Sequence, residues 1–311
     1  MLQKDRFLVK YKRFDVNGKT YESYNRTLDK LYSNFGLYEN ENFKNITADD
    51  VEDWIESLTK AHRKSSLNLY IEHLAEFFSY LQKKDLVEKN PMKAIRRFSE
   101  NEVDNDAKDK YVATIEDIRR LLDSTNTREK GERNFEFTSK RDKALLSFLV
   151  VSGCRQTIAR ILTYDMMEEI KNGIAFNVDG KYTKSGKNQR IVIGNKALEY
   201  LKVHIENVKQ QCIESEYIFT SIKGKQLGAT EVRDIMDKAK KKANLDVEGK
   251  QFSPHCLRNF LATHLVNEGV NPIIIKTICH WSQEKNDMLS RYATKDIKKY
   301  DNQIIEVTNI L

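Results

Sequence analysis

Apolar residues in the first third of the chain recur with the period of an amphipathic helix. The longest stripe follows Ser65-Ser66 and consists of Leu67, Tyr70, Ile71, Leu74, Phe77, Phe78 and Leu81. Residues with this spacing share one face of a helix, so the stripe predicts a helix that buries this face. Three shorter stripes of the same kind precede it, and Asn90-Pro91 marks a turn after it. Residues 1–97 are therefore predicted to form a small all-helical domain.

The helical pattern is then interrupted by a polar segment. Residues 98–111 include the sequence SENEVDNDAKDK, which has almost no apolar side chains and no period, and we expect them to form a linker. Beyond it, Thr114 and Asp117 have the spacing of a helix cap. The apolar stretch from Arg141 to Val151 predicts a buried helix that ends at Ser152-Gly153-Cys154-Arg155.

Two later segments have the pattern of strands. Residues 174–178 and 190–193 are rich in β-branched and aromatic side chains, and a basic turn at residues 179–187 separates them, as in a β-hairpin. Residues 217–219 predict a further short strand. Helical spacing returns at residues 197–211 and 230–243 and in a C-terminal amphipathic tail from Ile297 to Ile305. Residues 112–311 are therefore predicted to form a mixed α+β domain, mostly helical, with one small antiparallel sheet and a tail helix.

Polar groups with the chemistry of a phosphate site gather between residues 253 and 292. Ser253-Pro254 is a helix-start signal, with a hydroxyl at the N-cap and proline at the first helical position. His255 and Arg258 follow three residues apart, so their side chains leave the same face of that helix. His280 and Tyr292 come later in the same stretch. Two histidines, an arginine and a tyrosine around a pair of helices suggest a site for a phosphate.

Charge and cysteine content narrow the class of protein. The 311 residues include 53 Lys and Arg against 46 Asp and Glu, which gives a net charge of +7 and favours a polyanionic partner without establishing one. The four cysteines, at 154, 212, 256 and 279, form no CxxC pair, as expected in a reducing cytoplasm. We expect a cytoplasmic protein, because no signal peptide and no apolar run of about 18 residues occurs.

A zinc site is a less satisfactory interpretation of the cysteines. Cys154, Cys256 and Cys279 adjoin candidate site residues, but neighbouring positions on a helix diverge by about 100°, so Cys256 and His255 would not converge on one metal. We interpret the three cysteines as small packing residues beneath the site.

Six residues, in this order and after an all-helical block, resemble the active-site set of the tyrosine recombinases, the family of phage integrases and Xer-type recombinases. They are Arg155, Lys184, His255, Arg258, His280 and Tyr292. The matching segments are SGCR at 152–155 with LTYDMM at 162–167, TKSGKNQRIVI at 183–193, HCLR at 255–258, ICHWS at 278–282 and SRYA at 290–293. The N-terminal block, which ends in SYLQKKDLVEKNP, resembles the core-binding domain of that family.

The resemblance implies a transesterification on DNA. A tyrosine, here Tyr292, attacks a backbone phosphate and forms a 3′-phosphotyrosyl bond, so that rejoining needs no metal or nucleotide cofactor. Arg155 and Arg258 would hold the charge that gathers on the non-bridging oxygens, since a guanidinium donates a planar fork of hydrogen bonds that lysine lacks. The remaining implied roles are proton acceptor for His255, general acid for Lys184 and phosphate ligand for His280.

Each residue also has a plainer interpretation. Arg155 suits an ion pair, His255 a helix cap and His280 a half-buried core position. Lys187 competes with Lys184 in the basic turn, and Tyr300 competes with Tyr292 as the nucleophile.

The sequence departs from the family pattern at two points. The position three residues after Arg155 is Ile158 where the family has an acid, and the interval from His280 to Tyr292 is longer than usual.

The resemblance implies double-stranded DNA with a specific recombination site as the partner. The hydrophobic tail at the C-terminus resembles tails that dock on a neighbouring protomer, which implies a tetramer on DNA. Two alternatives remain open at this point: a type IB topoisomerase, which shares the chemistry, and a catalytically silent DNA-binding protein of the same fold.

Overall fold

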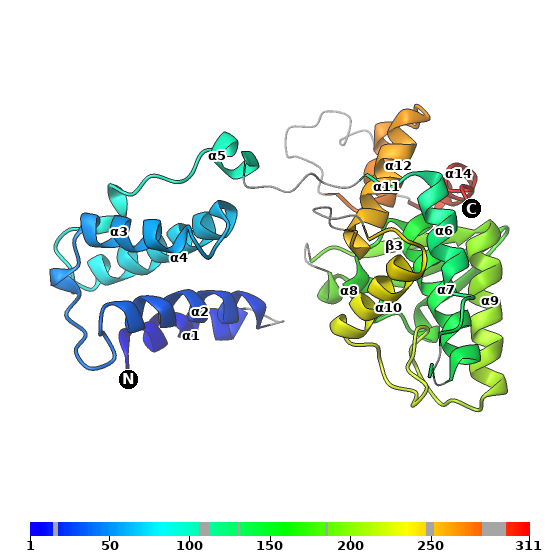
Figure 1. Ribbon diagram of the computed structural model, residues 1–311, viewed down its shortest axis with the longest axis horizontal. Helices are drawn as coiled ribbons and strands as arrows, with labels where there is room; N and C mark the ends of the chain where they lie inside the picture. The colour runs from blue at the N-terminus through cyan, green and yellow to red at the C-terminus, as the bar shows by residue number, and fades with distance from the viewer. Residues whose placement is uncertain are drawn as a thin grey trace. The chain divides into compact units, whose positions relative to one another are not determined.

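A computed structural model of the chain contains two compact units, Met1–Lys108 and Asp109–Leu311 (Figure 1). The structure describes residues 1–14, 18–105, 112–129, 131–132, 134–183, 186–246, 252–281 and 297–311. Within these ranges, no helix is both long and apolar enough to cross a lipid bilayer.

The regular elements of the first unit are all helices in the part of the chain that the structure describes, as predicted. Its elements are α1 (Gln3–Phe14), α2 (Lys19–Asn34), η1 (Phe43–Asn45), α3 (Ala48–Leu58), α4 (Lys64–Lys83), η2 (Pro91–Lys93) and α5 (Glu100–Asn105). The apolar stripe of α4 is buried, and Phe77 and Phe78 are among the largest fully buried side chains, together with Phe7 of α1 and Tyr32 of α2. The stripe thus forms the centre of this core.

Helix α5 lies within the segment that the sequence analysis expects to be a linker. Its start is fixed locally, because the Ser99 backbone N–H donates to the Glu102 carboxylate at 2.8 Å and the Ser99 hydroxyl donates to the same oxygen at 2.7 Å. A short helix that is stabilised by its own cap needs no apolar stripe, so hydrophobic periodicity does not reveal it.

The second unit is mostly helical with one small sheet, as predicted. Its elements are α6 (Ile115–Ser124), α7 (Phe135–Ser152), α8 (Gln156–Ala159), η3 (Tyr164–Met166), β1 (Met167–Ile170), β2 (Gly173–Val178), η4 (Gly180–Tyr182), β3 (Gln189–Gly194), α9 (Asn195–Gln210), α10 (Ala229–Lys242), α11 (Pro254–Asn267), α12 (Pro272–Ile278), η5 (Ile297–Tyr300) and α14 (Asp301–Val307).

The sheet has three antiparallel strands in the order β1-β2-β3. Strands β2 and β3 are the predicted hairpin, paired from Gly173 opposite Gly194 to Val178 opposite Gln189. Strand β1 has the sequence MEEI, whose partial exposure at the edge of the sheet hides it from a search for apolar alternation. The strand expected at residues 217–219 is wrong: Tyr217 forms only an isolated bridge with Thr163.

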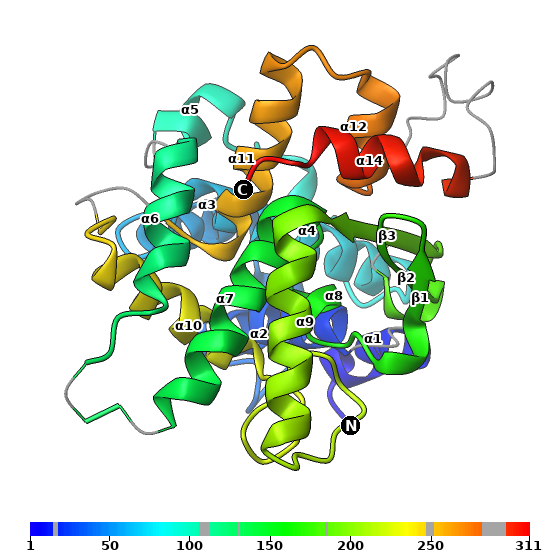
Figure 2. The same ribbon diagram turned by 90° about the vertical axis from the view of Figure 1, so that its right-hand side faces the viewer.

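Helix α7 is the centre of the second unit. Its C-terminal half, from Ala144 to Ser152, is entirely buried. It packs against α9, α11 and β3, and Figure 2 shows α9 running alongside it. Because neighbouring elements cover this half of α7, the helix can end only where they leave room for the backbone to turn.

Gly153 makes that turn possible. It is the C-cap of α7 with φ 56°, in the left-handed region. A Cβ at this position would lie 3.0 Å from Leu261 Cδ2 of α11, 3.6 Å from Ile278 Cγ2 at the end of α12 and 3.6 Å from the Cys279 sulfur. The end of α7 therefore meets α11 and the end of α12 at a point with no space for a side chain.

This close approach predicts that Gly153→Ala destabilises the second unit by about 2–4 kcal/mol, since backbone strain and overpacking add. Gly269→Ala is the matched control, because Gly269 has φ 68° and no described atom lies within 4 Å of the added Cβ. Urea denaturation should show a loss of only about 1–2 kcal/mol for that control. Equal losses in the two variants would contradict the packing argument.

Candidate active site

Arg258 connects three segments that are distant in the sequence. It lies on α11, is only 4% exposed, and donates from Nη1 to the Gly153 carbonyl oxygen at 2.5 Å and from Nη2 to the Cys279 carbonyl oxygen. These carbonyls lie at the C-terminal ends of α7 and α12, where backbone oxygens lack partners within the helix and carry partial negative charge. The buried guanidinium therefore satisfies two helix ends and joins α7, α11 and α12.

Arg155 is the second cation of the site. It follows the Gly153 turn as the N-cap residue of α8, has an extended backbone and is exposed. Burial lowers the pKa of Arg258, and the charge of Arg155 lowers it further. The turn after α7 thus brings an exposed arginine within electrostatic reach of a buried one, although the two are 103 residues apart in the sequence (258 − 155).

His280 occupies a backbone position that normally suits glycine. Helix α12 ends in a Schellman motif, in which the His280 N–H donates to the Thr277 carbonyl at 3.1 Å and the Trp281 N–H to the Lys276 carbonyl at 3.0 Å. In this motif the first residue after the helix C-cap adopts the left-handed conformation. His280 occupies that position, with φ 47°. A non-glycine residue here costs free energy, so its presence points to a role for the imidazole itself.

The environment of His280 keeps the imidazole neutral. Its Nε2 atom is buried and has no hydrogen-bond partner among the described residues. Burial lowers its pKa to about 4, and the charges of Arg258 and Arg155 contribute in the same direction. A buried polar nitrogen without a partner, beside two arginines, is the environment expected for a group that awaits an anionic ligand.

His255 is exposed in the first turn of α11, three residues before Arg258. Ser253, not His255, is the N-cap residue, and its backbone N–H donates to the Cys256 sulfur at 3.4 Å. This capping role of Cys256 is not among the predictions from the sequence. The feature that indicates it is the position of Cys256 three residues after a serine N-cap.

Lys184 and Tyr292 lie outside the described residues. The flanks of Lys184 are described, and they close the turn: the Thr183 hydroxyl donates to the Lys187 carbonyl at 2.8 Å and the Gly186 N–H donates to the Thr183 carbonyl at 3.3 Å. The rival Lys187 is exposed, and the rival Tyr300 is partly buried against the core.

Packing in the hydrophobic core explains Ile158 and two of the cysteines that adjoin the site. Ile158, at the position where an acid was expected, is 3% exposed and belongs to the hydrophobic core. Cys154 and Cys279 are also buried in that core, where burial raises the pKa of both thiols, to about 11 for Cys154. Both thiols are therefore protonated at neutral pH and act as packing groups. In the described part of the chain, no group of three or more His, Cys, Asp and Glu residues is arranged to hold a metal.

Comparison with known proteins identifies the class. Residues 111–299 match the family described as "Phage integrase family", and residues 15–85 match "Phage integrase, N-terminal SAM-like domain". The tyrosine recombinase XerC of Thermodesulfovibrio yellowstonii is 26% identical over 267 residues, which are 83% of this chain and 80% of that protein. The tyrosine recombinase XerD of Vibrio cholerae is 28% identical over 167 residues, which are 52% of this chain and 53% of that protein.

Solved structures agree in fold. Residues 75–356 of lambda integrase, in a dimer bound to a COC′ core site, superpose with a TM-score of 0.69 at 14% identity, covering 91% of this chain and 95% of that one. The XerH site-specific recombinase bound to a palindromic difH substrate gives a TM-score of 0.68 at 16% identity, covering 85% and 73%. The fold is that of the integrase-type recombinases. Since the first match covers more than half of the sequence, the chain belongs to the phage integrase family, the tyrosine-type site-specific DNA recombinases.

The low pKa of His280 predicts a specific pH dependence of stability. The folded pKa of about 4 lies below the usual value near 6.5, so the unfolded state binds more protons between these values and stability falls as the pH is lowered from about 6.5 to 4. Over this whole pH range, the free energy of unfolding falls by about 3 kcal/mol. His280→Asn keeps a residue that tolerates the left-handed backbone but removes the titration, so its melting temperature should fall less between pH 7.5 and pH 5.

His204 is a suitable control for this measurement. It is a core histidine whose pKa burial also lowers to about 4, and it remains in the His280→Asn protein. The difference between the two proteins therefore isolates His280. An unchanged pH dependence in the variant would contradict the assignment.

Proposed function

We propose that Arg155, Arg258 and His280 bind the non-bridging oxygens of one DNA phosphate, that Tyr292 attacks its phosphorus, and that Lys184 protonates the leaving 5′-oxygen. The observation that carries this proposal is the convergence of two guanidiniums and a buried, unpartnered imidazole at the meeting of α7, α11 and α12. Two like charges within electrostatic reach of each other, one of them buried, favour the binding of an anion.

The hydrogen bonds of Arg258 leave donors for a phosphate. A guanidinium has five N–H groups, and toward the described residues Arg258 uses one on each of Nη1 and Nη2. The two carbonyls therefore fix the plane of the guanidinium, and three N–H groups have no acceptor among the described residues. A group held in this way needs no reorganisation when charge develops on the phosphate oxygens, which is how a preorganised site lowers the barrier.

His280 complements the two arginines as a neutral donor. An imidazole with a pKa of about 4 carries one ring proton at neutral pH and donates it without adding a third positive charge to the site. A bound phosphate supplies the negative charge and the acceptor that the buried Nε2 atom lacks among the described residues.

The reaction exchanges one ester bond for another. The Tyr292 oxygen forms a bond to phosphorus and its proton passes to His255, while the bond from phosphorus to the 5′-oxygen breaks and that oxygen takes a proton from Lys184. The 3′-phosphotyrosyl ester keeps the energy of the phosphodiester bond, so a 5′-hydroxyl can reverse the step and join a different strand.

We further propose that the substrate is double-stranded DNA with a specific site, bound by a tetramer in the cytoplasm. The net charge of +7 supports a nucleic-acid partner. A lambda integrase tetramer bound to a Holliday junction and XerH bound to its difH substrate have the same fold. These similarities support the same mode of action for this chain.

The proposal predicts a covalent complex that depends on Tyr292. Nicked duplexes tiled across the DNA that flanks the gene should trap an adduct that survives denaturing gels, because the nick lets the 5′-hydroxyl strand diffuse away before rejoining. Tyr292→Phe should abolish this adduct, and Tyr300→Phe, the matched control, should form it. An adduct that persists in Tyr292→Phe would refute the nucleophile. Relaxation of a supercoiled plasmid that lacks the site would indicate a topoisomerase instead.

A further inference from the structure

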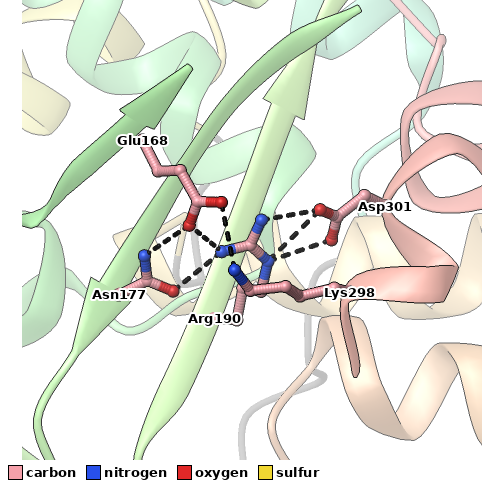
Figure 3. A network of polar contacts seen from close by, with 5 residues as sticks. All are labelled: Glu168, Asn177, Arg190, Lys298 and Asp301. Atoms are coloured by element: carbon pink, nitrogen blue, oxygen red, sulfur yellow. Dashed lines mark hydrogen bonds and ion pairs between the residues drawn. The ribbon is translucent and has the colours of Figure 1, made fainter. Parts of the chain in front are cut away.

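A buried ion-pair network lies beside the sheet and includes none of the residues proposed for the chemistry (Figure 3). Its centre is Arg190, near the start of β3, which is 7% exposed. Arg190 donates from Nη2 to Asp301 Oδ2 at 2.7 Å and from Nε to Asp301 Oδ1 at 3.1 Å, a bidentate pair. Its Nη1 donates to Glu168 Oε2 at 2.6 Å and to Asn177 Oδ1 at 2.8 Å. One guanidinium thus binds side chains of β1, β2 and α14.

The Glu168 carboxylate of the network is held in its charged form. Hydrogen bonds from Arg190, Asn177 and Lys298 lower the pKa of Glu168 to about 2. The Asn177 side chain donates to Glu168 at 2.8 Å, and Lys298 donates to the other carboxylate oxygen at 3.2 Å. Among the described residues, the Nε, Nη1 and Nη2 atoms of Arg190 thus each have an acceptor, as a buried charge requires.

Apolar contacts fasten α14 at the other end of the same strands. Added Cβ atoms at Gly173 and Gly194 would lie 2.9 Å and 2.6 Å from Ile305, so this side chain packs directly on the backbone of β2 and β3. The Asn195 side chain also donates to the Ile305 carbonyl at 2.9 Å. Helix α14 is therefore attached to the sheet by two sets of contacts, one polar and one apolar.

The apolar contacts alone could hold α14 on the sheet, so the ion pair needs a separate explanation. A buried ion pair adds little net stability, because the cost of removing both charges from water offsets their attraction. Its bidentate geometry does fix the orientation of the partners, since the planar guanidinium fork accepts a carboxylate in few arrangements. The network therefore specifies where α14 begins more than how strongly it is held.

The position of Asp301 in the chain suggests what this registration serves. Asp301 is nine residues after Tyr292, and His280 is twelve residues before it. In general, the entropy of closing a chain segment depends on where its two ends are fixed. After this interval, Lys298 and Asp301 attach the described chain to Glu168 and Arg190 of the sheet.

We propose that Arg190 and Asp301 are positioning residues for the nucleophile: by fixing the start of α14 on the sheet, they set the rate at which Tyr292 attacks DNA. This proposal rests on the proposed function. It assigns no contact with DNA to either residue. It predicts a defect in the attack by Tyr292 and none in DNA binding or in proton donation by Lys184.

Asp301→Asn tests this proposal, because asparagine has the same shape but lacks the charge of the bidentate pair. At saturating DNA and 25 °C, we expect adduct formation to slow at least tenfold while DNA binding stays within twofold of the unchanged protein. The matched control is Glu199→Gln, which removes a carboxylate from an exposed ion pair with Lys196 on α9 and should leave the rate unchanged.

The choice of leaving group identifies which step is affected. A substrate whose bridging 5′-oxygen is replaced by sulfur releases a thiolate, which needs no proton from an acid because thiols have pKa values near 8.5. Lys184→Ala should be slow on the oxygen substrate and restored on the sulfur substrate. Asp301→Asn should be slowed by the same factor on both.

Three results would overturn the proposal: an unchanged rate in Asp301→Asn accompanied only by a lower melting temperature, a rate restored by the sulfur leaving group, or a parallel loss of DNA binding. The first would leave the pair a purely structural role, and the second would make it act through Lys184. Failure of the proposed function is distinguishable, since the unchanged protein would then form no adduct on either substrate.

Discussion

The site depends on the bonds that the buried Arg258 guanidinium donates to the carbonyls of Gly153 and Cys279. These bonds join the ends of α7 and α12 to α11. The chain leaves each end in the left-handed region, through Gly153 after α7 and His280 after α12. Arg155 lies two residues after the Gly153 turn, and His280 is itself the residue that makes the second turn. The contact that completes the helix ends therefore also determines where the chain reaches Arg155 and His280.

The electrostatic state of the site follows from the same arrangement. Burial and the positive charges of Arg258 and Arg155 keep the His280 imidazole neutral. Buried positive charge and a buried nitrogen with no partner among the described residues are unfavourable, and the phosphate that we propose as ligand would relieve both. A non-glycine residue at a glycine-type helix end and a buried polar atom without a partner are small costs in the free protein. The proposed phosphate complex gives a physical reason for the fold to accept them.

Much of this organisation is predictable from the sequence, and the exceptions have physical causes. Stripes such as that of α4 and the hairpin of β2 and β3 predict their elements, because burial imposes a period on apolar residues. Strand β1 and helix α5 depend on edge pairing and a local cap, which leave no such period. The order of Arg155, Arg258 and His280 indicates the site. The junction of their helices is formed by hydrogen bonds to backbone carbonyls, which residue types do not reveal. The Arg190–Asp301 pair joins residues 111 positions apart, and residue types do not reveal this pairing either.

The most direct test of this account is the rate of covalent adduct formation by Arg258→Lys, measured together with DNA binding. Lysine keeps the positive charge but cannot bind both carbonyls and still present a planar fork to a phosphate. The account predicts a rate at least 100-fold lower, as expected when a preorganised donor is lost, with DNA binding nearly unchanged. A lysine variant that cleaves at close to the original rate, or one that loses binding and cleavage in parallel, would contradict the assignment of Arg258 to the reacting phosphate.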